Sequence, residues 1–220
     1  MKTRALIIFL FALFALTTGQ LLAQKAQAPA RVNPPAAKDY FPLRVGDSWK
    51  YQMIDEEAEY TLKVLSAEKQ SDGTMLYLLE KMAGVEIHEW YFKTNGWVLL
   101  HKESYSQQET AVVEHEPPRQ VLKNPLVAGE KWRWSGKTIS QTDVTESNEV
   151  AGPETVKVPA GTFRAMKVVS HVQEAESGGV TKTYWYAEGV GLVKWMTEGA
   201  QLKYGWELVD YSFKRPQRNK

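Results

Sequence analysis

The chain of 220 residues contains no cysteine. This absence excludes disulfide bonds, thiolate metal sites and a cysteine nucleophile. It also excludes the covalent lipid anchor that bacterial lipoproteins carry on a cysteine, so we expect no such anchor. A chain without disulfides must be stabilised by its core, and roughly 200 residues are enough to form one.

Long apolar runs are absent except at the start of the chain. Basic Lys2 and Arg4 precede an apolar run from Ala5 to Leu16, and small and polar residues follow it. This run is shorter than the roughly 20 residues that cross a bilayer, which is typical of a secretory signal peptide. We therefore expect residues 1–23 to direct export to the periplasm or the exterior, and we expect no transmembrane segment after them.

Neither sign of charge is in excess. Removing residues 1–23 leaves 25 basic side chains (27 minus 2) against 26 acidic ones. A nucleic-acid-binding domain would show a strong positive excess, so we expect no nucleic-acid partner. Residues 214–220 hold four basic groups, and we interpret them as a solvated tail.

Motifs of known catalytic chemistry are missing as well. The sequence has no Gly-x-Ser-x-Gly elbow, phosphate-binding glycine loop, zinc-protease helix or calcium loop. We therefore expect no cofactor, and the sequence favours a non-enzymatic protein. A hydrolase acting on envelope polymers stays open, because paired carboxylates can come together only in the fold.

What the chain does have is the period of β-strands. Trp49 and Tyr51 alternate with polar residues, as do Trp132 and Trp134, and no stretch shows a helical stripe. The sequence predicts an all-β protein, a curved antiparallel sheet or half-open β-barrel of about ten to twelve strands.

The domain plan follows from composition. Residues 24–39 are rich in Ala and Pro and contain no aromatic residue, which is typical of an extended linker. We predict a single β domain over residues 40–213. Its halves, residues 40–116 and 117–213, are expected to be related.

Two aromatic signatures, each occurring twice, suggest these halves. Gly46–Tyr51 is echoed by Gly129–Trp134, and Glu89–Gly96 is echoed by Tyr184–Gly191. The offsets are 83 residues (129 minus 46) and 95 residues (184 minus 89). Such self-similarity indicates a fold built from repeated units.

The Asn95–Gly96 dipeptide predicts a hairpin, since it supplies the two positive-φ positions of a tight turn. Pairing outward from it sets Trp90 opposite His101 and Glu89 opposite Lys102. One face of this hairpin is then expected to carry His88, Trp90, Phe92, Leu99, His101 and Glu103.

Three residues of that face are candidate metal ligands. His88 is expected opposite Glu103 and diagonal to His101, and two imidazoles with a carboxylate can bind a metal ion such as zinc. The hairpin offers no fourth ligand, and the histidines are not repeated 95 residues later. The sequence therefore favours histidines that are satisfied by hydrogen bonds at the rim of an apolar face.

A second metal-like sequence is Glu114-His115-Glu116. Adjacent strand residues point to opposite faces, so only the two glutamates could act together. Because Pro117-Pro118 follows, we interpret the segment as a strand that runs out into a loop.

The abundant aromatic residues either fill a core or line a ligand cavity. For the cavity we expect ligand-binding residues on the concave face, with a lipid or other amphipathic small molecule as the partner. The candidates are Trp90, Phe92, Leu99, Trp49 and Trp132. The alternative is a structural or protein-interaction module of the cell envelope.

Three segments together resemble a family of uncharacterised secreted or lipid-anchored bacterial proteins. They are Gly46-Asp47-x-Trp49-x-Tyr51, Val158-Pro-Ala-Gly-Thr-Phe163 and Trp185-Tyr-Ala-x-Gly-Val-Gly-x-Val193-Lys194. The resemblance implies a curved antiparallel sheet or half-open barrel in the cell envelope, similar to lipoprotein-carrier and lipocalin-like architectures. Many members carry the anchoring cysteine that this chain lacks, and the family supplies no agreed activity.

Overall fold

The computed structural model describes residues 38–106, 111–138, 140–175 and 178–213. The expected signal peptide, almost all of the linker and the basic tail lie outside these residues. Twelve strands and no helix occur in the described part, and none of its segments is a helix that could span a membrane. The strands are β1 (Ser48–Met53), β2 (Glu59–Lys69), β3 (Met75–Met82), β4 (Glu86–Thr94), β5 (Trp97–Tyr105), β6 (Ala111–Lys123), β7 (Lys131–Lys137), β8 (Asp143–Val158), β9 (Gly161–Glu174), β10 (Gly178–Ala187), β11 (Gly191–Glu198) and β12 (Lys203–Ser212).

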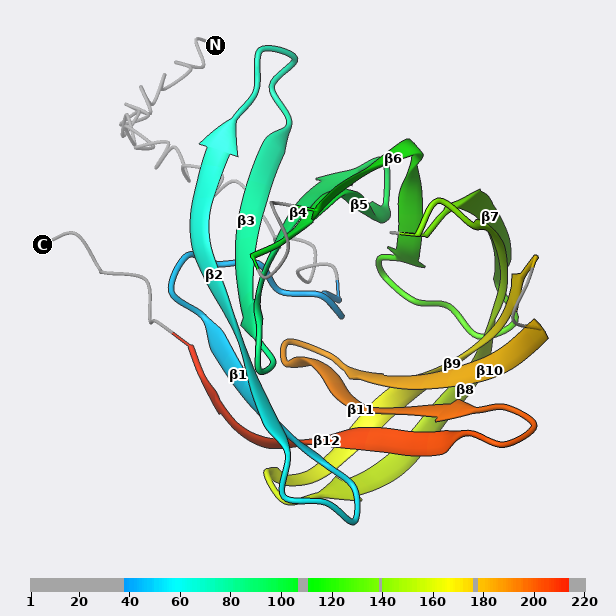
Figure 1. Ribbon diagram of the computed structural model, residues 1–220. Coiled ribbons are helices and arrows are strands. Elements are labelled where there is room, and N and C mark those ends of the chain that lie inside the picture. Colours follow the sequence, from blue (N-terminus) through cyan, green and yellow to red (C-terminus); the bar gives the residue numbers. More distant parts are fainter. Residues whose placement is uncertain (1–37, 107–110, 139, 176–177, 214–220) are drawn as a thin grey trace, which may run out of the picture. The chain divides into compact units, whose positions relative to one another are not determined.

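All twelve strands form one antiparallel sheet in the order β6-β5-β4-β3-β2-β1-β12-β11-β10-β9-β8-β7. The sheet bends so strongly that its edge strands, β6 and β7, come close to each other and nearly close a barrel (Figure 1). The all-β prediction is confirmed.

Alternation along the strands places the core inside this curve. In β7 the buried Trp132 and Trp134 alternate with exposed Lys131, Arg133 and Ser135, as the period of a half-buried strand requires. Apolar residues from the whole sheet join the same core. Those with no exposed surface are Val64, Val98, Leu122, Val150, Val193 and Leu208.

A tight corner leads into β1. Gly46 has a φ of 90°, a conformation that glycine adopts without strain. Its amide donates to Val64 O at 2.8 Å, and the Val64 amide donates to Asp47 O at 2.9 Å. These two bonds tie the entrance of the strand to β2.

The entrance to β7 is built in the same way. Gly129 has a φ of 84°, its amide donates to Val150 O at 2.8 Å, and the Val150 amide donates to Glu130 O at 2.9 Å. β2 and β8 each then have a register shift next to that valine. The repeated Gly-acidic-x-Trp sequence thus forms the same corner twice.

The Asn95–Gly96 turn has the expected positive φ values of 49° and 75°. The predicted pairing holds from the turn to Tyr91, which lies opposite Leu100. Beyond Tyr91 it is wrong, because a β-bulge leaves His101 without a partner in β4.

The bulge sets Trp90 opposite Lys102, Glu89 opposite Glu103 and His88 opposite Ser104. Since the extra residue reverses the alternation, Glu103 moves to the inner face, away from His101 and His88.

The echoed hairpin between β10 and β11 has the same irregularity. Tyr186 lies opposite Leu192, the register then shifts, and Trp185 lies opposite Lys194. In both hairpins the lysine ammonium lies over the facing tryptophan ring, 4.5 Å from the Trp90 centroid and 5.9 Å from the Trp185 centroid. The second signature therefore also forms the same local structure twice.

These equivalent features divide the sheet into two sets of six strands, β1–β6 and β7–β12. The division falls between β6 and β7. The boundary expected between residues 116 and 117 lies inside β6.

No backbone ladder joins β6 to β7 in the described sheet. Trp132 Nε1 donates to Gln120 O and Trp134 Nε1 to Pro117 O, each at 3.0 Å, so side chains close the seam. The expected loop at Pro117-Pro118 is wrong, because β6 continues to Lys123. Proline has no N–H group to donate to a neighbouring strand. The two prolines are tolerated because they lie on an edge strand, in an irregular stretch that is not paired with β5.

Candidate functional site

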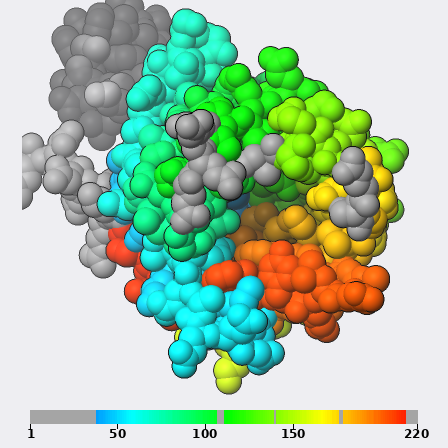
Figure 2. All heavy atoms as spheres, in the orientation of Figure 1, coloured from blue at the N-terminus to red at the C-terminus, as the bar shows by residue number. Residues whose placement is uncertain are grey.

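The inner face of the sheet encloses a cavity of about 260 Å³. Strands of both sets line it, together with the segment from Phe41 to Leu43 that precedes β1. Figure 2 shows the molecule hollowed between the green strands of the first set and the orange strands near the end of the chain. The two sides of the cavity differ in chemistry.

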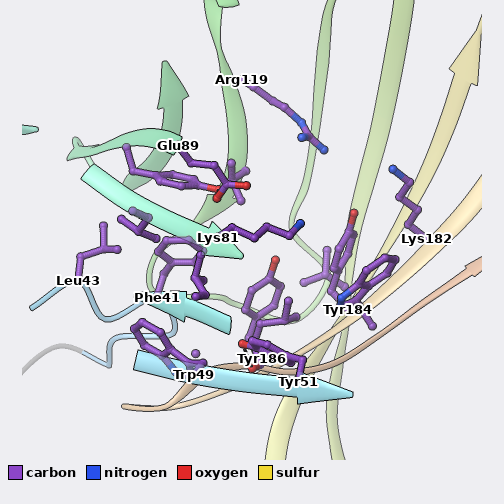
Figure 3. A pocket seen from close by; sticks show the side chains of 18 of the residues that line it. Phe41, Leu43, Trp49, Tyr51, Lys81, Glu89, Arg119, Lys182, Tyr184 and Tyr186 are labelled. Carbon is purple, nitrogen blue, oxygen red and sulfur yellow. Dashed lines mark hydrogen bonds between the residues drawn. The ribbon is translucent and has the colours of Figure 1, made fainter. Parts of the chain in front are cut away.

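One side of the cavity is aromatic and apolar. Phe41, Leu43, Trp49 and Tyr51 lie together there (Figure 3). The polar atoms of the two β1 rings are engaged with backbone carbonyls, because Trp49 Nε1 donates to Val190 O at 2.7 Å and Tyr51 OH donates to Leu192 O at 2.9 Å. Their ring surfaces are therefore left for apolar contact.

The other side carries charged side chains. Lys81, Glu89, Arg119 and Lys182 extend into it from four strands (Figure 3). Arg119 contacts Glu146 of β8 at 2.7 Å and 3.2 Å. Burial disfavours the guanidinium charge, but Glu146 together with Tyr184 and Glu103 outweighs it and raises the pKa of Arg119.

Two further glutamates are opposite each other on β4 and β5. Glu103 Oε2 lies 3.2 Å from His115 Nε2, and Glu89 accepts a hydrogen bond from Tyr91 OH at 2.9 Å. Burial raises the pKa of Glu89. Burial acts in the same direction on Glu103, but His115, Arg119 and Lys81 together outweigh it and lower that pKa.

A row of polar residues crosses the second set of strands. Asn148 pairs with Ser170, and Ser170 pairs with Lys182, so the three lie side by side on β8, β9 and β10. All three line the cavity. Asn148 is only 7% exposed, and its Nδ2 has no hydrogen-bond partner among the described residues.

Of the five expected ligand-binding residues, one lines this cavity. Trp49 does so, whereas Trp132 is buried in the core against Trp97. Trp90, Phe92 and Leu99 lie on the outer face, because their neighbours Glu89, Tyr91 and Leu100 point inward. The expected orientation of that hairpin is therefore wrong.

The structure does not bring the candidate metal ligands His88, His101 and Glu103 together. The bulge turns Glu103 to the cavity, while His88 Nε2 lies 3.2 Å from Glu86 and His101 Nε2 lies 3.3 Å from Glu114. Within the described part of the chain, the group with metal-ligand spacing is Glu80, Glu86 and His88 on β3 and β4.

The charged side of the cavity was not predicted, since Glu103 was expected only as a metal ligand and its other charged residues were not candidates for a site. Their signal is present in the sequence, since Lys182 shares a strand face with Tyr184 and Tyr186, and Glu89 shares one with Tyr91. A charged residue in register with buried aromatics marks an unusual inward position. Recognising it requires knowing which face of each strand is inward.

Comparison with known proteins supports the fold. Residues 130–198 match the model of a family described as DUF3108-like, a range that runs from the corner before β7 to the end of β11. This range contains the second and third resemblance motifs, and the first lies outside it. No curated protein matches the chain.

Three solved structures are similar. A candidate lipoprotein from Parabacteroides distasonis is 13% identical with a TM-score of 0.51, over 80% of this chain and 99% of that one. A candidate exported protein with a YmcC-like fold from Bacteroides fragilis is 15% identical with a TM-score of 0.48, over 80% and 100%. The hypothetical lipoprotein YmcC from Escherichia coli is 13% identical with a TM-score of 0.42, over 75% and 84%. The first of these shows that the fold is shared.

Proposed function

We propose that this chain is an exported, non-enzymatic protein of the bacterial cell envelope that binds an amphipathic small molecule inside its curved sheet. The observation that carries the proposal is the division of the cavity into an aromatic side and a charged side (Figure 3). An amphipathic molecule would remove its apolar chain from water on one side and present its polar group to the other.

Two observations support the export and the size of the ligand. The expected signal peptide agrees with the description of the Parabacteroides protein of the same fold as a lipoprotein. The cavity volume of about 260 Å³ is close to the lower end of the roughly 300–1,000 Å³ of ordinary small-molecule sites. It therefore suits an amphiphile with a single chain.

Mass spectrometry of small molecules extracted from the natively purified protein tests this proposal, together with binding of a fluorescent fatty acid. Leu62→Trp should abolish most binding, because Leu62 lines the cavity and a larger ring would fill it. Thr61→Trp is the matched control on the exposed face of the same strand. A protein that is empty when purified and binds no fluorescent fatty acid would overturn the proposal, and a dimer in that case would favour an interaction module.

One specific observation favours a hydrolase as the second candidate. Glu89 and Glu103 face each other in the cavity, and their pKa values are shifted in opposite directions, as in an acid–base pair. Incubation with envelope polysaccharides and peptidoglycan, followed by mass spectrometry, tests it. Products should form with the unaltered protein and be lost in both Glu89→Gln and Glu103→Gln.

A further inference from the structure

The charged side of the cavity contains two lysines that the fold does not neutralise directly. Its three carboxylates are already engaged by Arg119, His115 and Tyr91. Among the described residues, neither Lys81 nor Lys182 has a carboxylate oxygen within ion-pair distance, although both line the cavity. Both lysines therefore lack a direct carboxylate partner, although Lys81 Nζ lies 5.0 Å from the Tyr60 ring centroid and its charge acts on Glu89 and Glu103.

Lys182 also lies at the end of a row of hydrogen-bond donors. Asn148, Ser170 and Lys182 occupy successive strands, so the row extends over about 10 Å at the spacing of neighbouring strands. The amide Nδ2 of Asn148 is buried without a described partner, and a buried donor of this kind is costly unless something accepts its hydrogen bond. An acceptor group in the cavity would satisfy it.

The cationic groups of the cavity also act on one another. Lys81 extends from β3 on the other wall into the same space (Figure 3). Burial, then the charge of Arg119 and to a smaller extent that of Lys81, lower the pKa of Lys182, and the charges of Glu146 and Glu174 oppose this shift without reversing it. Because like charges disfavour each other there, an anion between them would be attracted by both walls.

We propose that the polar group of the bound amphiphile is an anion, a carboxylate or a phosphate, that lies between Lys81 and Lys182 and accepts a hydrogen bond from Asn148. Its apolar chain then extends towards the aromatic side. This inference rests on the proposed function, since it names the class of ligand that the same cavity binds.

Calorimetric titration with four amphiphiles of equal chain length tests the inference. Dodecanoate and dodecyl phosphate are the anions, monododecanoylglycerol is the neutral probe, and dodecyltrimethylammonium is the cation. We expect at least one anion to bind about tenfold or more tightly than the neutral probe, as a charge-assisted hydrogen bond allows. The comparison of the two anions distinguishes a carboxylate from a phosphate.

Substitution of the lysines locates the headgroup. Lys81→Met and Lys182→Met should each weaken binding of the preferred anion about tenfold and leave binding of the neutral probe unchanged. Lys63→Met is the matched control, because Lys63 is exposed on β2. Thermal unfolding of each variant, followed by circular dichroism, separates loss of binding from loss of folding.

The outcomes separate the two proposals. If the neutral or cationic probe binds as tightly as both anions, or if both lysine variants bind the anion normally, the anionic headgroup is wrong while an amphipathic ligand stands. If no probe of any charge binds, the proposed function fails and this inference fails with it.

Discussion

The first six strands and the last six begin with the same glycine corner, and their fourth and fifth strands share the same bulge under a lysine–tryptophan contact. Their cavity walls differ at equivalent positions. Leu62, opposite Trp49, corresponds to Asn148, opposite Trp132, and Glu89, next to Trp90, corresponds to Tyr184.

The difference shows what the repeated sequence determines. Corners and bulges set the path and curvature of each set of strands, and the same backbone geometry requires the same residues. The backbone geometry does not restrict the type of the inward side chains near the cavity in this way. One set can therefore present a leucine where the other presents an amide, and the two walls together form a cavity that neither forms alone.

The largest expected effect comes from the ion pair that joins the two sets. Replacing Glu146 by Leu leaves the Arg119 guanidinium without its carboxylate, and breaking a buried pair in this way costs about 3 kcal/mol of the free energy of unfolding. Urea denaturation measures it. The double variant Arg119→Leu/Glu146→Leu should recover much of the loss, and equal stabilities of the single variant and the unaltered protein would contradict the role of the pair.

The two corners should respond alike. Gly46→Ala and Gly129→Ala each place a Cβ on a residue of positive φ, at a cost of roughly 1–2 kcal/mol in unfolding free energy. Their effects should add in the double variant, because the corners belong to different sets of strands. A large effect at one glycine and none at the other would show that the corners are not equivalent.

The fold was predictable because its signals are local. The alternation around Trp132 and the positive-φ dipeptide Asn95–Gly96 report strand and turn without reference to distant residues. The repeated glycine corner could be recognised in the same way.

The site was harder to predict because its geometry depends on register. One bulge at His101 places Glu103 on the inner face, so Glu103 does not lie with the two histidines as proposed. His115, expected only to point away from Glu114 and Glu116, contacts Glu103 on the neighbouring strand β5. Such contacts depend on the register shifts at all the bulges between the strands concerned. They cannot be predicted from one segment of the sequence.

Binding of an anionic amphiphile should depend on pH because Lys182, which belongs to the second set of strands, gains and loses a proton. Burial and Arg119 lower the pKa of Lys182, so this lysine loses its proton below the ordinary range of lysine. Above the pH range in which Glu89, also in the cavity, loses its proton, affinity should be constant and then fall about tenfold as pH rises through that lowered pKa. Dodecanesulfonate, whose charge does not change, is the probe for calorimetry, and Lys182→Met should remove this fall.

Exchanging an equivalent residue between the walls should have a smaller effect. Asn148→Leu gives the second set the residue that the first set has at Leu62, and it removes a buried donor without a described partner. Binding of the preferred anion should weaken about fivefold while unfolding free energy is unchanged or higher. Calorimetry and urea denaturation together measure this, and unchanged affinity would mean that the amide does not contact the ligand.

The smallest effect concerns the lysines over tryptophan on the outer face. Lys102→Met removes a cation–π contact worth about 0.5 kcal/mol at a partly exposed site. Lys194→Met should cost about 1 kcal/mol, because this lysine also contacts Glu207 at 2.6 Å. In a Glu207→Gln background the two substitutions should have equal effects on urea denaturation. If they still differ, the hairpins differ in more than this ion pair, and the equivalence of β4–β5 with β10–β11 would extend only to the backbone.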